Sequence, residues 1–278
     1  MLVSSAFNTF LFEARLGGQK DKTRRNYLTT LNSFITAVGD IPIELLALEH
    51  ITRWKMFLDA QGKAHSTMSA YLCHLRGVLK FVASRNVKVM DYREVTLPRV
   101  KQNKPVYLEY GEVQMIIDAT DNVRDKAIIA LLFSTGCRIS ELLSINRGDI
   151  LGNEVVVTGK GDKHRRVYID PKAMKLLVAY METRTGTRTP LFISGQYRRL
   201  TVSRVEQIIH QTTNAAGIEK NVTPHVFRHT FATDLLRNGA NIRAIQNMLG
   251  HSNLNTTMRY THVSDIDLEA AHKKYHSS

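Results

Sequence analysis

The segment 223–260 constrains the fold most, because it contains start and stop signals for two helices in close succession. Thr223 and Pro224 predict a helix start, with a hydroxyl at the cap position and a proline at the first helical position. Gly250 predicts the end of a second helix over about 241–249, since glycine readily adopts the conformation that stops a helix. The sequence therefore indicates two helices and a tight stop in this part of the chain.

Four residues suited to phosphate chemistry lie at the ends of these helices. His225 and Arg228 are three apart and share one face of the first turn. That turn presents free backbone N–H groups and the positive end of the helix dipole, which together favour phosphate binding. His251 directly follows the second helix, and Tyr260 falls in the next short helical segment. Two imidazoles, a guanidinium and a phenol can bind, protonate and attack a phosphodiester.

These residues closely resemble the C-terminal signature of the tyrosine recombinases, also called the phage integrase family. Upstream, STGCRISELLSI (134–145) resembles the family's first arginine box, and VVVTGKGDKHRRVYI (155–169) resembles its lysine hairpin. The resemblance is strong over 107–263 and rests on pattern alone before that. Six residues in the right order and spacing argue against a chance match. The catalytic set implied by the resemblance is Arg138, Lys160, His225, Arg228, His251 and Tyr260.

The charge of the chain indicates a polyanionic partner. Its 278 residues include 38 Lys and Arg against 25 Asp and Glu, a net charge of +13. We expect nucleic acid as the first candidate and an acidic membrane surface as the second. The two cysteines, Cys73 and Cys137, make neither a disulfide framework nor a zinc ribbon. No signal peptide or membrane span is recognised, so the sequence predicts a cytoplasmic protein without membrane contact.

Apolar residues at helical spacing predict four helices in residues 1–85. The polar faces of these helices are basic, which suits contacts with DNA phosphates. This part resembles the family's SAM-like core-binding domain, which clamps one side of the DNA. A basic linker is expected over 86–106, where prolines bracket RVKQNK. The basic residues are Lys20, Lys22, Arg24, Arg25, Lys63, His65, Arg76, Lys80 and Arg85.

Residues 107–278 are expected to form the catalytic domain, so the chain is mainly α with a small antiparallel β-hairpin or sheet. Alternating β-branched residues predict strands over 155–158 and 165–169, joined by a turn that holds Lys160 between two glycines. Lys163 lies in the same turn and is the alternative lysine; the family pattern selects Lys160. The other basic residues of the hairpin are expected to contact DNA: Lys163, Arg165 and Arg166.

A further helix is expected over 138–145, with Arg138 in its first turn. Glu141 follows three residues later, so an ion pair along the helix can orient the guanidinium. The family also has an acidic residue at this position. A last helix is expected over 265–275, and one alternative is that it packs on its own core. In the family that the chain resembles, the terminal helix typically docks in a neighbouring protomer, which would make it an assembly device.

Cleavage of a phosphodiester without a metal ion needs charge neutralisation, a nucleophile and protonation of the leaving 5′ oxygen. Arg138 and Arg228 suit the first task, because guanidinium forks match the extra charge on the phosphorane. Tyr260 is the expected nucleophile and would form a 3′-phosphotyrosyl link. The remaining roles follow from the resemblance alone: Lys160 as general acid, His225 as base, and His251 as a hydrogen-bond donor to the phosphate.

Two other chemical interpretations are weaker. His225 and His229 have the spacing of two zinc ligands on one helix. However, Val226 stands where such enzymes keep a glutamate, and no carboxylate nearby completes the set. Cys137 has no base placed beside it, so we expect a buried packing residue rather than a thiol nucleophile. The sequence therefore predicts neither a metal nor a cofactor.

The expected function is a site-specific DNA recombinase. We expect four protomers, identical or mixed with a related recombinase, on two DNA duplexes, with strand exchange through a Holliday junction. The length leaves no room for an extra arm-binding domain, which favours the Xer-type members and simple integrases. Two alternatives are considered. A type IB topoisomerase-like relaxing enzyme would share the chemistry without partner exchange. A non-catalytic DNA-binding relative would keep the fold without turnover, and the complete catalytic set argues against it.

Overall fold

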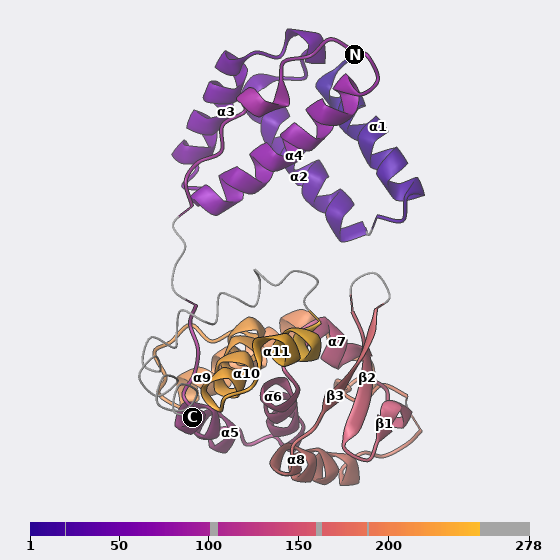
Figure 1. Ribbon diagram of the computed structural model, residues 1–278, viewed down its shortest axis with the longest axis vertical. Coiled ribbons are helices and arrows are strands. Elements are labelled where there is room, and N and C mark those ends of the chain that lie inside the picture. Colours follow the sequence, from indigo (N-terminus) through magenta and orange to yellow (C-terminus); the bar gives the residue numbers. More distant parts are fainter. Residues whose placement is uncertain (20, 101–104, 160–162, 188, 251–278) are drawn as a thin grey trace, which may run out of the picture. The chain divides into compact units, whose positions relative to one another are not determined.

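The computed structural model describes residues 1–19, 21–100, 105–159, 163–187 and 189–250. The chain divides into two compact units, Met1–Asn103 and Lys104–Ser278. Each unit has its own hydrophobic core. Figure 1 shows the helices and strands of each unit.

The first unit contains the four α-helices that the apolar spacing predicts, and two short 3-10 helices. The α-helices are α1 (Val3–Leu16), α2 (Asp21–Val38), α3 (Leu48–Ala60) and α4 (His65–Ala83), and the 3-10 helices are η1 (Ile43–Leu45) and η2 (Tyr92–Glu94). Trp54 of α3 and Phe34 of α2 are fully buried, and their rings pack edge to face at 5.2 Å between centroids. The indole N–H donates to Ser33 Oγ at 3.1 Å, so the polar atom of the largest core side chain has a partner.

The segment expected to be a linker, 86–106, belongs in part to the first unit. It contains η2, and Val95 is wholly buried in the first core. Arg76 Nε donates to the carbonyl of Tyr92 at 3.1 Å, which ties η2 to α4. The prediction that the linker begins at residue 86 is therefore wrong. Composition alone did not reveal that Val95 is buried or that Arg76 binds the backbone of Tyr92.

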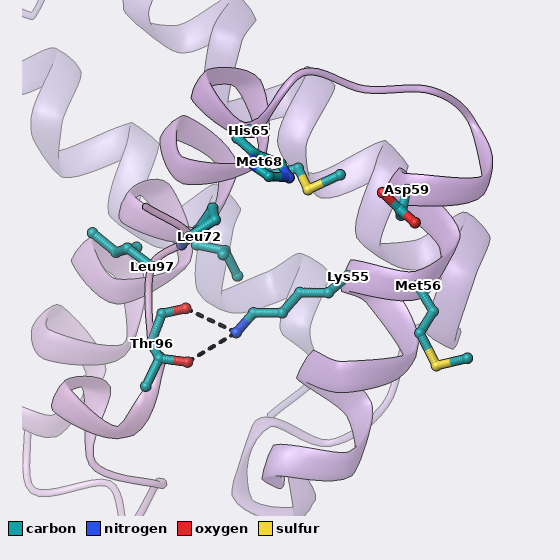
Figure 2. Close-up of a pocket in the computed structure, with 9 residues that line it drawn as sticks. Lys55, Met56, Asp59, His65, Met68, Leu72, Thr96 and Leu97 are labelled. Carbon is teal, nitrogen blue, oxygen red and sulfur yellow. Dashed lines mark hydrogen bonds between the residues drawn. The ribbon is translucent and has the colours of Figure 1, made fainter. Parts of the chain in front are cut away.

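A contact of Lys55 fixes the chain that follows η2 (Figure 2). Lys55 Nζ donates to the carbonyl and hydroxyl oxygens of Thr96 at 2.8 and 3.0 Å, across a pocket of about 330 Å³. Burial lowers the pKa of Lys55. The Lys55 side chain thus holds the segment around Thr96 against α3. The pocket is lined by Lys55, Met56, Asp59, His65, Met68, Leu72, Thr96, Leu97 and Pro98.

The second unit is mainly helical with one small antiparallel sheet. The strands β1 (Ile150–Leu151), β2 (Glu154–Thr158) and β3 (His164–Tyr168) lie in the order β1-β2-β3. The predicted hairpin is present, and β1 adds a third strand. The helices are α5 (Tyr110–Asp118), α6 (Val123–Thr135), α7 (Ile139–Ser144), η3 (Arg147–Asp149), α8 (Pro171–Glu182), α9 (Val202–Ala215), α10 (Pro224–Arg237) and α11 (Ile242–Leu249).

The helix α6 forms the centre of the second unit, with α5, α7, α8 and α10 packed against it (Figure 1). All of residues 127–132 are buried, so the helix is apolar around most of its circumference, as expected of an interior helix. Its N-terminus is capped by the Asn122 side chain, which accepts from two backbone N–H groups. Its C-terminus is Gly136, in the left-handed conformation. Among the described helices, none is long and apolar enough to cross a membrane.

Candidate active site

Arg138 lies just before α7 rather than within it. The sequence predicts a helix over 138–145 with Arg138 in its first turn, but Arg138 is the N-cap residue. Its backbone N–H donates to Glu141 Oε2 and its Nη1 to Glu141 Oε1, both at 2.8 Å. The expected ion pair is therefore confirmed, and the same carboxylate caps the helix start. The Arg138 side chain remains 35% exposed, so its guanidinium can meet a ligand.

A second arginine binds the same carboxylate. Arg165 of β3 donates from Nη1 and Nη2 to the two oxygens of Glu141 at 2.9 and 2.6 Å, and from Nε to the carbonyl of Met248 at 2.8 Å. The Arg165 side chain is 11% exposed and that of Glu141 only 3%. The prediction that Arg165 is an ordinary DNA contact is therefore wrong, because all three nitrogen atoms of its guanidinium donate to Glu141 or to the carbonyl of Met248.

The charge on Glu141 depends on these hydrogen bonds. Burial alone would raise the pKa of Glu141 by disfavouring the carboxylate. Hydrogen bonds from Arg165 and from the backbone and guanidinium of Arg138 outweigh burial and lower the pKa of Glu141 to about 2. Burial likewise opposes the charge on Arg165, but its bonds to Glu141 raise the pKa of the guanidinium. Both groups are fully charged at neutral pH, so the pair is a fixed part of the site.

Arg228 is held by backbone carbonyls from two helix ends. It is 5% exposed, in the first turns of α10. Its Nη1 donates to the carbonyl of Gly136 at 2.7 Å and its Nη2 to the carbonyl of Leu249 at 2.6 Å. These carbonyls lie at the C-terminal ends of α6 and α11, where the helix dipole is negative and favours a cation. The second candidate arginine is thus buried and fixed from two sides.

The start of α10 agrees with the sequence in position but not in detail. The helix begins at Pro224 with Thr223 as N-cap, yet the Thr223 hydroxyl makes no cap hydrogen bond, contrary to the prediction. His225 is exposed in the first turn, whereas Arg228 is buried. The turn therefore presents an imidazole at the surface above a buried guanidinium. The second predicted helix is confirmed: α11 ends at Gly250, whose φ of 64° is left-handed.

Cys137 is a packing residue, as the sequence predicts. Its side chain is fully buried next to Arg138. Burial raises the pKa of the Cys137 thiol to about 11. The thiol therefore stays protonated at neutral pH and is a poor nucleophile.

Three predicted site residues lie outside the described residues: Lys160, His251 and Tyr260. The described residues next to two of them lie near the arginine cluster, which is formed by Arg138, Arg165 and Arg228. The N–H of Gly159 donates to the carbonyl of Lys163 at 2.8 Å, and Gly159 lies next to Glu141. Gly250 lies against the side chain of Arg165. The structure thus brings together Arg138, Arg228 and the described neighbours of two further candidates.

The alternation of residues along β3 could have predicted that Arg165 faces the inside of the unit. Alternate residues of a strand face the same side of the sheet. In β3, Val167 is buried and Arg166 is exposed, and Arg165 pairs with the buried Val157 of β2. The alternation places Arg165 on the inner face, where an arginine needs a carboxylate partner.

Comparisons with known proteins identify the family of the chain. The phage integrase family matches residues 107–266 of the chain. The tyrosine recombinase XerD of Oceanobacillus iheyensis is 31% identical over 277 residues, which cover 93% of each protein. The crystal structure of XerA recombinase is 27% identical, with a TM-score of 0.57 and coverage of 99% of both chains.

A more distant structure shares the fold. The lambda integrase tetramer bound to a Holliday junction superposes with a TM-score of 0.79 at 17% identity, covering 94% of this chain and 77% of the integrase. At that level of identity the likeness concerns the fold alone. It agrees with the predicted fold class, mainly α with a small antiparallel sheet.

Proposed function

The chain belongs to the phage integrase family, and we propose from this that it is a site-specific tyrosine recombinase that cuts and rejoins double-stranded DNA. The observation that carries the proposal is the arginine cluster of the second unit. Among the described residues, Arg138 and Arg165 both bind the carboxylate of Glu141, and Arg228 binds the backbone next to each of them. The cluster therefore carries more positive than negative charge, and Arg138 is its partly exposed member. Such a site suits an anionic phosphate more than a neutral ligand.

The proposed reaction exchanges one phosphate ester for another. The phenol oxygen of Tyr260 attacks the scissile phosphorus, and the bond from phosphorus to the 5′ oxygen breaks. His225 accepts the phenol proton and Lys160 gives a proton to the leaving 5′ oxygen. The product is a 3′-phosphotyrosyl link and a free 5′-hydroxyl. A 5′-hydroxyl from a second DNA strand then reverses the step and joins the new strand.

The arginines stabilise the charge that develops between these two esters. We propose that Arg138 and Arg228 bind the non-bridging oxygens of the phosphorane, with His251 donating a further hydrogen bond. Rigid placement favours this role, because donors that are already oriented need little reorganisation in the transition state. The contact of Arg138 with Glu141 and those of Arg228 with two backbone carbonyls support such placement.

The proposed assembly is a tetramer on two DNA sites, formed by this chain alone or with a related recombinase. The net charge of +13 supports a DNA partner. We propose that the first unit is the core-binding domain and the second the catalytic domain, with the segment 265–275 as an assembly element. Xer-type recombination is the preferred interpretation, with cytoplasmic DNA as the substrate.

A trapped covalent adduct tests the proposal. The DNA site is first selected from a random duplex library, and a nick is then placed beside the cleavage position so that a short fragment diffuses away. We expect an adduct with the unmodified protein, none with Tyr260→Phe, and no loss in the presence of a chelator. Peptide mapping should find the nucleotide on Tyr260. An adduct on another residue, or one that a chelator abolishes, contradicts the proposal.

The choice between the two hairpin lysines needs a separate test. A substrate with sulfur in place of the bridging 5′ oxygen has a leaving group that needs no general acid. We expect Lys160→Ala to lose cleavage of the ordinary substrate and to recover it on the sulfur substrate. Lys163→Ala should cleave the two substrates with the same ratio as the unmodified protein. The opposite pattern would assign the general acid to Lys163.

A further inference from the structure

Arg165 joins three separate segments of the candidate site. Its two Nη atoms bind the two oxygens of Glu141 in α7 at 2.9 and 2.6 Å. Its Nε donates at 2.8 Å to the carbonyl of Met248, in the last turn of α11. One side chain of β3 therefore connects the helix that follows Arg138 with the end of the helix that precedes Gly250.

The contacts of the cluster close into a ring. Arg228 donates to the carbonyl of Leu249, which directly follows the carbonyl that Arg165 binds. Its other Nη atom donates to Gly136, which ends α6 just before Arg138. Arg138 in turn binds the carboxylate that Arg165 holds. The two proposed phosphate-binding arginines are thus linked twice, once through Gly136 and once through Arg165.

The side chain of Arg165 lies in a closely fitted space. A Cβ at Gly250 would lie 3.1 Å from Arg165 Cδ and 3.3 Å from its Nη1. A Cβ at Gly159 would lie 3.4 Å from Glu141 Oε1 and 3.8 Å from Arg165 Nη1. Both glycines therefore lie close to the ion pair of Arg165 with Glu141. This confinement differs from an exposed arginine that reaches toward a DNA backbone.

We infer that Arg165 is a positioning residue for DNA cleavage. It fixes the carboxylate of Glu141, and Glu141 orients the guanidinium of Arg138 toward the scissile phosphate. The inference rests on the proposed function. A guanidinium is required because its planar fork binds both carboxylate oxygens while Nε donates in another direction, which a lysine ammonium does not reproduce.

A double-mutant cycle tests whether Arg165 acts through Arg138. The measurement is the single-turnover rate of adduct formation on the nicked substrate at saturating protein. In the unmodified background, Arg165→Met should lower this rate constant about 100-fold and change the Kd for DNA less than about 3-fold. In an Arg138→Ala background, the same change should lower the residual rate less than about 3-fold. Equal losses in both backgrounds would overturn the inference.

Two further variants separate positioning from charge and from folding. Arg165→Lys keeps the charge but not the fork, so we expect at least about a 10-fold loss of rate; full activity would overturn the inference. This variant also serves if Arg165→Met does not fold, which circular dichroism and thermal unfolding report. As the matched control, Arg237→Met removes an exposed arginine that pairs with Glu109, and should stay within about 2-fold.

The cycle distinguishes failure of this inference from failure of the proposed function. If the unmodified protein forms no adduct on its selected site, both are overturned. If it forms an adduct on Tyr260 and the losses add fully, only the positioning role is overturned. A second substrate, with a methyl group in place of one non-bridging oxygen, removes the charge that Arg138 would neutralise. On that substrate, the effect of Arg165→Met should shrink in the same way.

Discussion

Arg228 Nη1 donates a 2.7 Å hydrogen bond to the carbonyl oxygen of Gly136, the residue that ends α6. A side chain of α10 thereby fixes the backbone just before Arg138. Arg228 is only 5% exposed, and its other hydrogen bond, to Leu249, fixes the end of α11. Interior contacts therefore fix Arg228, one of the two arginines proposed to bind the phosphate.

The two carbonyl bonds of Arg228 predict a stability loss for a conservative change. Arg228→Lys keeps a positive charge, but one ammonium cannot reproduce the fork that spans two separate carbonyls. A buried acceptor left unpaired costs about 1–3 kcal/mol, and we expect that loss in the free energy of unfolding measured with urea. Arg237→Lys, at an exposed ion pair, should change it by less than about 0.5 kcal/mol. Similar values for both variants would contradict the structural role of Arg228.

Gly136 predicts a steep penalty for the smallest side chain. Its φ is 57°, and a Cβ there would lie 2.3 Å from the ring of Phe231. Gly136→Ala should therefore lower the free energy of unfolding by more than about 2 kcal/mol. Gly148 is the matched control, because it is exposed and a Cβ at this position would have no neighbouring atom within 4 Å. We expect Gly148→Ala to stay within about 0.5 kcal/mol in the same chemical unfolding measurement.

The depressed pKa of Glu141 predicts a particular dependence of stability on pH. The pKa is about 2 in the folded protein against an ordinary value of 4.5. The carboxylate therefore contributes stability that is fully present above about pH 4.5 and is lost as the pH falls toward 2. The shift corresponds to about 3 kcal/mol.

The matched comparison for this effect is Glu141→Gln. The difference in free energy of unfolding between the unmodified protein and Glu141→Gln should be constant from pH 5 to 7 and shrink as the pH is lowered from about 4.5 to 2. Unfolding in urea at each pH, followed by circular dichroism, measures it. A difference that does not change across this range would show that Glu141 is not held ionised by its arginines.

The two cysteines are predicted to differ sharply in reactivity. Cys73 is exposed, whereas Cys137 is fully buried and the pKa of its thiol is raised to about 11 by burial. In the folded protein at neutral pH, iodoacetamide should therefore modify only Cys73. Intact-mass measurement should show one adduct under native conditions and two in denaturant. Modification of Cys137 in the folded protein would indicate that the region around Arg138 opens.

Local sequence signals predicted the elements whose causes lie close together in the chain. Pro224 and Gly250 marked the start of α10 and the end of α11, because ring geometry and left-handed φ act within one turn. The ion pair of Arg138 with Glu141 was predicted from helical spacing, and it forms although Arg138 is the N-cap residue, because the side chain of Glu141 reaches back to the cap. By contrast, composition assigned 86–106 to a linker, although Val95 belongs to the first core.

By itself, then, the sequence determined the family, the mainly α fold with its small sheet, and the helix that carries Arg228. Only the tertiary structure decided the role of Arg165. Its carboxylate partner is 24 residues away in the chain and its carbonyl partner 83 residues away. Spacing along one helix or strand says nothing about such contacts. They form only when β3, α7 and α11 pack together and a guanidinium that is only 11% exposed must find its acceptors within the protein.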